Sequence, residues 1–239
     1  MSRYRSDIFD LYGTLADIRT DERGRRLWQR TALWYTEQGA PYEADELRKA
    51  YRSLCEREQK RRRDPWYEIE LRRVFRALYA EKGRAADRRL VDATAMFFRI
   101  ESLRKLRRYP WVEPVFRELR AQGAGIYLLS NAQACFTGPE LRALELADAF
   151  DGIVLSSDVG VKKPGPAIMQ TLLSRYALSV ADCLMVGNEQ RADIAVAQSV
   201  GMDALYLRTE TSGTYDPALR VERELLDGDF SRQPALLGL

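Results

Sequence analysis

Histidine is absent from the 239 residues of the sequence. Its absence excludes Ser-His-Asp and Cys-His nucleophilic catalysis, zinc sites with histidine ligands, and acid–base catalysis by imidazole. Any catalysis by this chain must therefore use carboxylates, hydroxyls, lysine, arginine or a hard metal ion.

Cysteine and long apolar runs are also scarce. The three cysteines, Cys55, Cys135 and Cys183, are widely spaced and form no Cys-x-x-Cys pair, which argues against a disulfide framework or a thiolate zinc site. No apolar run approaches the ~20 residues that a bilayer-spanning helix needs, and the first residues do not resemble a secretory signal. We therefore expect a cytoplasmic protein that does not bind membranes.

Charge divides the chain into two kinds of segment. Residues 18–108 contain 25 Lys and Arg against 15 Asp and Glu, whereas the remainder has an acidic excess. Apolar residues in this middle segment recur at helical spacing, with breaks at Gly39, at Asp64-Pro65 and at Lys82-Gly83. The pattern predicts about four helices and no strand.

The flanking segments alternate short apolar runs with helical stretches. The strand-like runs are Asp7–Phe9, Gly125–Leu129, Gly152–Leu155, Cys183–Val186 and Ala204–Leu207. Strands that alternate with helices are typical of a doubly wound, mainly parallel sheet. The sequence therefore predicts an α/β, Rossmann-like core made of residues 1–17 and 109–239, into which an all-helical domain of residues 18–108 is inserted.

Polar side chains follow these strand-like runs. Because open α/β sheets bind ligands beyond the carboxyl ends of their strands, we expect these side chains to share one crevice. Asp10 is suited to nucleophilic attack if nearby donors stabilise the resulting anion. Thr14, Ser130 and Asn131 offer such donors, and Lys163 offers a positive charge.

A metal site is expected in the same crevice. Glu189 and Asp193 lie four residues apart at a predicted strand-to-helix junction, so they could form a carboxylate cage with Asp10. Mg²⁺ prefers such oxygen ligands.

Four ordered motifs carry a resemblance to a known family. They are Phe9–Leu15 (FDLYGTL), Leu128–Asn131 (LLSN), Gly160–Pro166 (GVKKPGP) and Val186–Asp193 (VGNEQRAD). Together they resemble the haloacid dehalogenase-like hydrolase superfamily. The resemblance implies a covalent aspartyl intermediate on Asp10, Thr14 and Ser130 as ligands of the substrate anion, Lys163 as the lysine of the third motif, and a helical cap inserted between the first two motifs.

Two positions depart from the family patterns. Phosphatases of the superfamily usually have a second aspartate two residues after the nucleophile, whereas this chain has Tyr12, as the 2-haloacid dehalogenases do. The halide-binding arginine of those dehalogenases aligns with Gly39, and the pair Glu189 and Asp193 implies a metal that dehalogenases do not need. If Asn188 takes the place of the first acid of the fourth motif, one charge is lost.

We therefore predict Mg²⁺-dependent hydrolysis of a small phosphorylated metabolite. The expected metal ligands are Asp10, the Tyr12 carbonyl, Asn188 or Glu189, and Asp193. The alternatives are a metal-independent 2-haloacid dehalogenase and a binding or regulatory protein without turnover. We expect a small anionic substrate, a monomer or homodimer, and no nucleic-acid partner. The basic runs 60–63 and 104–108 are interpreted as solvated helix ends because acidic residues interleave with them.

Overall fold

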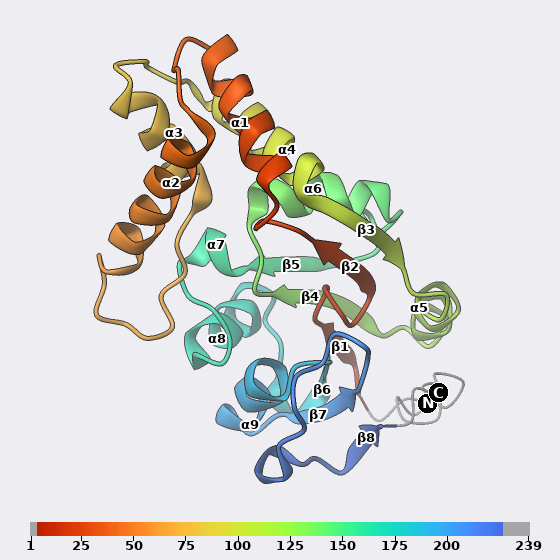
Figure 1. Cartoon of the computed structure of the whole chain (residues 1–239). Coiled ribbons are helices and arrows are strands. Elements are labelled where there is room, and N and C mark those ends of the chain that lie inside the picture. The colour runs from red at the N-terminus through yellow and green to blue at the C-terminus, as the bar shows by residue number, and fades with distance from the viewer. Residues whose placement is uncertain (1–3, 227–239) are drawn as a thin grey trace.

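The computed structural model describes residues 4–226. A six-stranded sheet has the order β5-β4-β1-β6-β7-β8, and all neighbouring strands are parallel (Figure 1). The strands are β1 (Ser6–Phe9), β4 (Gly125–Ser130), β5 (Gly152–Leu155), β6 (Cys183–Gly187), β7 (Asp203–Leu207) and β8 (Arg223–Leu225). The doubly wound α/β architecture and all five strands expected from the sequence are confirmed.

Helices cover both faces of the sheet, so its central strands are apolar on both sides. On one face Phe9 packs with α5 (Val112–Ala121) and α6 (Ala134–Ala143). On the other, Ile8 packs with α8 (Pro166–Arg175) and α9 (Ala195–Ser199). The shorter elements are α7 (Ser156–Val159), 3₁₀ turns at Val180–Asp182 and Pro217–Leu219, and a π-helical turn at Gln190–Ile194.

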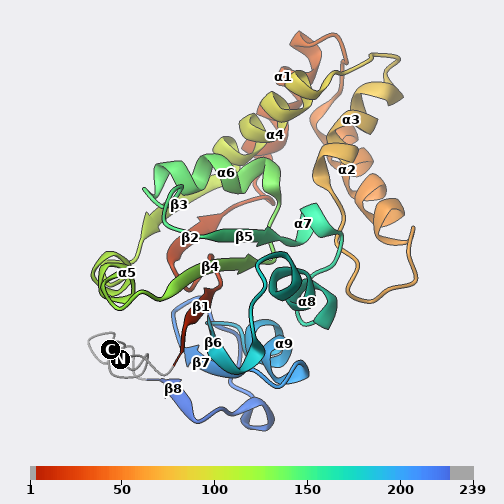
Figure 2. The same cartoon turned by 180° about the vertical axis from the view of Figure 1, so that it is seen from behind.

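Four helices between β2 and β3 form a separate body with its own hydrophobic cluster. They are α1 (Arg25–Glu37), α2 (Ala44–Gln59), α3 (Leu71–Glu81) and α4 (Arg88–Ser102). Figures 1 and 2 show this helical insertion standing beyond one end of the sheet. Cys135 and Phe136 of α6 belong to the same cluster, so the insertion packs directly against the core.

The middle segment is not all-helical, which corrects the expectation from the sequence. β2 (Ala16–Thr20) and β3 (Leu103–Arg108) pair antiparallel where the insertion leaves and rejoins the core. Asp17 is buried and pairs with Lys105 and with the Arg107 Nε at 3.0 Å. Ala16 and Leu106 also pack against the core, but the basic and acidic residues that interrupt these short strands hide their apolar pattern in the sequence. The basic run at 104–108 is therefore a strand and not a helix end.

The order of strands places a crevice beside β1. Its neighbours β4 and β6 lie on opposite sides, and the chain passes from β5 to β6 across β1. The connections thus diverge at the carboxyl end of β1, where doubly wound sheets bind ligands. Within residues 4–226 we find no helix long and apolar enough to cross a membrane.

Candidate active site

Asp10 follows β1 directly and lies at this crevice, with 7% of its surface exposed. Its Oδ1 accepts hydrogen bonds from Lys163 Nζ at 2.7 Å and from Ser130 Oγ at 3.1 Å. Its Oδ2 has a longer contact, 3.5 Å, with Thr14 Oγ1. Four residues that the sequence analysis selected from three separate motifs therefore meet at one carboxylate.

Lys163 is buried and connects Asp10 to the fourth motif. Its Nζ donates to Asp193 Oδ1 at 2.6 Å and to the Leu129 carbonyl at 2.8 Å. Burial alone would lower the pKa of Lys163, but the two carboxylates outweigh it and raise this pKa above its usual value. The side chain is therefore a fixed ammonium that balances part of the charge of the site.

Asn131 holds the main chain of Lys163. Its Nδ2 donates to the Lys163 carbonyl at 3.0 Å, and its Oδ1 accepts from the Lys163 N–H at 2.7 Å. The sequence analysis proposed Asn131 as a donor to the substrate. In the structure its amide is engaged with the loop of the third motif.

The acidic pair of the fourth motif does not form the expected cage. Asp193 uses Oδ1 for Lys163 and accepts the Glu189 N–H on Oδ2 at 2.9 Å, and burial raises the pKa of Asp193. Glu189 accepts from the N–H of Arg191 in its own turn at 3.4 Å. Among residues 4–226, no group of three or more acidic or cysteine side chains is arranged to hold a metal ion.

A smaller set of oxygen donors remains for Mg²⁺. Asn188 Oδ1 accepts from Thr14 Oγ1 at 3.1 Å, and its Nδ2 donates to Thr209 and Thr211, so the amide oxygen faces the residue that also contacts Asp10. Mg²⁺ commonly binds one or two carboxylates and completes its shell with water and substrate phosphate. Asp10 and Asn188 supply oxygen donors of the kind that such a limited site uses.

The hydroxyl of Tyr12 is bound to α6. It donates to the Glu140 carboxylate and lies 3.2 Å from Thr137 Oγ1, while Arg99 Nε donates to Glu140 Oε1 at 2.6 Å. Burial and the neighbouring Glu140 raise the pKa of Tyr12 above its usual value, so the phenol stays neutral. Glu140 and Arg99 belong to no motif, and nothing in the sequence pattern could have paired them with a residue 128 positions away from Glu140.

A pocket of about 290 Å³ opens onto these residues. Its lining is Asp10, Tyr12, Gly13, Ile18, Asn131, Lys163, Asn188, Glu189, Ala192, Asp193 and Thr211. It thus presents three carboxylates against one ammonium and has room for a small molecule. Gly39, at the end of α1 beside Arg84, does not line it.

The sheet and the Asp10–Lys163–Asp193 cluster define a hydrolase scaffold of the Rossmann-like class. More specifically, the chain belongs to the haloacid dehalogenase-like hydrolase family, which it matches over residues 8–201. It is therefore a hydrolytic enzyme by family.

Curated relatives include phosphatases. The chain is 37% identical over 99 residues to a phosphoglycolate phosphatase of Yersinia pseudotuberculosis, covering 41% of this chain and 42% of the relative. It is 30% identical over 135 residues to a phosphoserine phosphatase of Thermus thermophilus, covering 56% and 53%. The matched region thus spans about half or less of each relative.

Solved structures share the fold over nearly the whole chain. A 2-haloacid dehalogenase from Pseudomonas syringae superposes with a TM-score of 0.69 at 24% identity, covering 98% of both chains. A HAD phosphatase from Thermococcus onnurineus gives 0.62 at 20% identity, also covering 98% of both. Both chemistries therefore occur on this fold, and the fold alone does not select between them.

Proposed function

We propose that the protein hydrolyses phosphate monoesters of small metabolites through an aspartyl-phosphate on Asp10. The main support for the proposal is the difference in hydrogen bonding between the two oxygens of the Asp10 carboxylate. Lys163 and Ser130 hold Oδ1, while Oδ2 has only the 3.5 Å contact with Thr14. One oxygen is thus fixed and the other is available for attack. The phosphatase relatives support the same chemistry.

In this mechanism Asp10 Oδ2 attacks phosphorus, and the bond from phosphorus to the leaving oxygen breaks. Water then attacks the aspartyl-phosphate, which releases phosphate and restores the carboxylate. Lys163 offsets charge beside the nucleophile, while the Ser130 and Thr14 hydroxyls can donate to the transferring group. Mg²⁺ held by Asp10, Asn188 and the Tyr12 carbonyl would supply further positive charge to the phosphoryl oxygens.

The protonation of the leaving alcohol distinguishes this site from phosphatases with a second aspartate. Tyr12 occupies that position, and its hydroxyl donates its hydrogen bond to Glu140 rather than to the substrate site. A neutral phenol with a raised pKa is a poor general acid at neutral pH. We therefore propose monoesters whose leaving group departs readily without a side-chain acid, such as aryl phosphates.

The helical insertion, residues 18–108, is proposed to cap the core formed by residues 1–17 and 109–239. Its opening would admit substrate, and its closure would exclude bulk water from the pocket. We further propose a cytoplasmic enzyme that acts as a monomer or homodimer.

The test is a substrate panel assayed with Mg²⁺ and with a chelator, using the wild-type protein and Asp10→Asn. Phosphate release that Asp10→Asn abolishes, with an unchanged circular dichroism spectrum, supports the proposal. Chelator sensitivity supports the metal site. Substantial turnover by folded Asp10→Asn contradicts the assignment of the nucleophile.

Dehalogenation is the second candidate. It is favoured by Tyr12 two residues after the nucleophile and by Asn188 in place of a carboxylate, since a halide leaves without a proton and needs no metal. Release of halide from 2-haloacids in the presence of chelator would support it. A protein that acts on neither class would instead be a binding or regulatory protein on this scaffold.

A further inference from the structure

One segment of the helical insertion reaches the loops that carry the active-site residues. This docking segment, residues 66–71, lies between α2 and α3. Tyr67 forms an isolated antiparallel bridge with Val161. On either side of that bridge, the Glu68 N–H donates to the Gly160 carbonyl at 3.1 Å, and the Lys162 N–H donates to the Trp66 carbonyl at 2.8 Å. The donor of the second bond, Lys162, directly precedes Lys163.

The same segment contacts the loops after β4 and β5. Gln133, two residues beyond Asn131, donates from Nε2 to the Ile69 carbonyl at 2.8 Å and accepts the Leu71 N–H on Oε1 at 2.9 Å. Ser156 donates to Glu68 Oε2 at 3.0 Å. The docking segment is thus bonded to the loops of the second and third motifs and to the end of β5.

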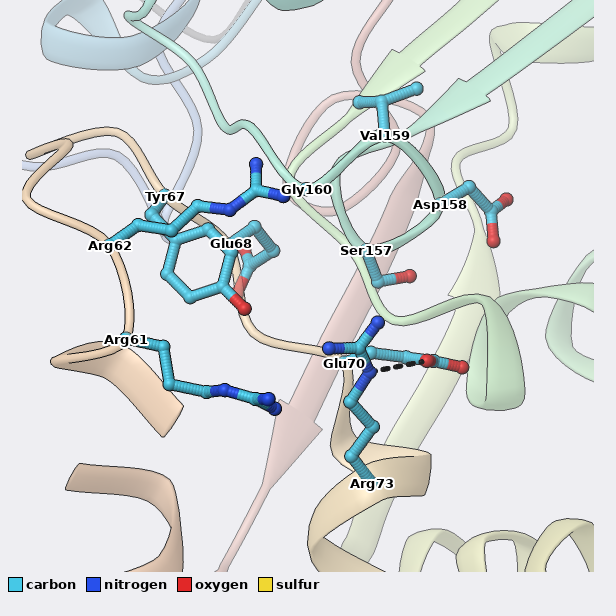
Figure 3. Close-up of a pocket in the computed structure, with 10 residues that line it drawn as sticks. All are labelled: Arg61, Arg62, Tyr67, Glu68, Glu70, Arg73, Ser157, Asp158, Val159 and Gly160. Carbon is cyan, nitrogen blue, oxygen red and sulfur yellow. Dashed lines mark ion pairs between the residues drawn. The ribbon is translucent and has the colours of Figure 1, made fainter. Parts of the chain in front are cut away.

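Polar and charged side chains surround the docking segment. Figure 3 shows the residues that line a pocket of about 440 Å³ here, among them Tyr67, Glu68 and Ser157, together with the side chains of Arg61 and Arg73. Most of the contacts are hydrogen bonds that water can replace at little net cost in free energy. Tyr67 is also buried and Leu71 packs against the hydrophobic cluster of the helical insertion, so the attachment combines hydrogen bonds with limited apolar contact.

We propose that the docking segment is a positioning element that couples the placement of the insertion to the placement of Lys163. While the segment is docked, the Trp66 carbonyl holds Lys162, and Asn131 holds the main chain of Lys163. When it leaves, the Asn131 contacts and the bonds of the Lys163 ammonium to Asp10, Asp193 and the Leu129 carbonyl remain, but the main chain that carries the ammonium loses one of its fixed points. The catalytic part of this inference rests on the proposed function, whereas the structural coupling does not.

Gly165→Ala tests the coupling with a single methyl group. Gly165 has φ −55°, which any residue tolerates, but an added Cβ would lie 2.7 Å from the Cβ of Trp66. The methyl should therefore push the docking segment away. The control is Gly138→Ala on α6, where an added Cβ meets nothing within 4 Å.

Two readouts are expected to change together in Gly165→Ala. Amide hydrogen exchange at Lys162 should speed up about tenfold because its acceptor is lost. The kcat should fall between about 10- and 100-fold with a smaller change in KM, because misplacing a catalytic group acts mainly on the chemical step. Gly138→Ala should match the wild type in both.

A rescue separates displacement of the segment from local damage to α8. Adding Trp66→Gly removes the clashing atoms and keeps the carbonyl that accepts from Lys162, so the double variant should recover slow exchange and turnover. Unchanged Lys162 exchange in Gly165→Ala, or no recovery in the double variant, overturns the proposal. If the wild type shows no activity on the panel but the exchange effects hold, the proposed function fails and the coupling stands.

Discussion

Arg99 of α4 donates from Nε to Glu140 Oε1 of α6 at 2.6 Å, across the boundary between insertion and core. Arg99 is 9% exposed and Glu140 is 4% exposed. The same carboxylate accepts the Tyr12 hydroxyl, and Tyr12 lies two residues after Asp10. The loop that follows the nucleophile is therefore connected to the helical insertion through one buried acid.

Glu140→Gln should lower the free energy of unfolding by about 3 kcal/mol, because it leaves the Arg99 guanidinium buried without its counter-charge. Urea unfolding at neutral pH measures this. The matched control is Arg30→Gln, which breaks the more exposed pair with Glu101 and should cost less than about 1 kcal/mol. The double variant Arg99→Met with Glu140→Leu should recover much of the loss. If Glu140→Gln and Arg30→Gln lower the free energy of unfolding by the same small amount, the Arg99–Glu140 contact does not stabilise the protein as a buried ion pair should.

Much of the fold could be predicted because the apolar runs that indicate its strands are short, local features of the sequence. The central strands are buried on both faces, so Leu184, Met185 and Val186 of β6 form a continuous apolar run that ends just before Asn188. β8 was missed because three edge residues carry little apolar pattern, and β2 with β3 because Asp17 pairs with basic side chains there.

The candidate site was only partly predictable. Strand ends and motif spacing located Asp10, Ser130 and Lys163 in one crevice. Whether Asp193 faces a metal or Lys163 depends on side-chain geometry that spacing does not encode. The role of Glu140 could not be predicted, because its partners lie in distant segments of the chain and no motif marks its position in α6.

Asn188→Asp should strengthen Mg²⁺ binding. The change places a second carboxylate near Asp10 and keeps the oxygen that now accepts from Thr14. Without Mg²⁺ the added like charge should lower Tm, and with Mg²⁺ the rise in Tm should exceed that of the wild type, because a ligand that binds the folded state more tightly stabilises it more at the same concentration. Thermal unfolding across a Mg²⁺ titration measures this independently of activity. Sodium at matched ionic strength is the control, and identical Mg²⁺ shifts in both proteins would contradict the site.

Glu189→Gln should change the preference for the charge of the leaving group. Glu189 lines the pocket and has no ion pair with any residue from 4 to 226. It should therefore disfavour an anionic leaving group by about tenfold, the Coulomb energy of unit charges about 6 Å apart at an effective dielectric constant of about 40. The measurement is kcat/KM for three phenyl phosphates that carry a para aminomethyl, hydroxymethyl or carboxylate group.

In Glu189→Gln the penalty on 4-carboxyphenyl phosphate should shrink by about that factor, while the neutral substrate changes little. Glu118→Gln on α5, an exposed position outside the pocket lining, is the control. A penalty that is the same in both variants and the wild type would show that Glu189 does not act on the leaving group.

Because of Asp7, we expect the free energy of unfolding to depend on pH, and this dependence is independent of turnover. Its carboxylate in β1 is fully buried and has no hydrogen-bond partner among residues 4–226, and burial raises its pKa from 3.8 to about 7. Between these two pH values the folded state binds a proton that the unfolded state has released. The free energy of unfolding should therefore fall as pH rises from about 4 to about 7, by on the order of 4 kcal/mol, and level off above that range.

Asp7→Asn removes the titrating group, so the variant should lose this slope and gain stability relative to the wild type as pH rises. Urea unfolding at intervals between about pH 4.5 and pH 8 measures both curves. Ser6→Ala, in the same strand, is the control: serine does not titrate in this range, so its effect on the free energy of unfolding should be the same at every pH. Parallel curves for Asp7→Asn and the wild type would show that Asp7 ionises at the same pH in the folded and unfolded chain.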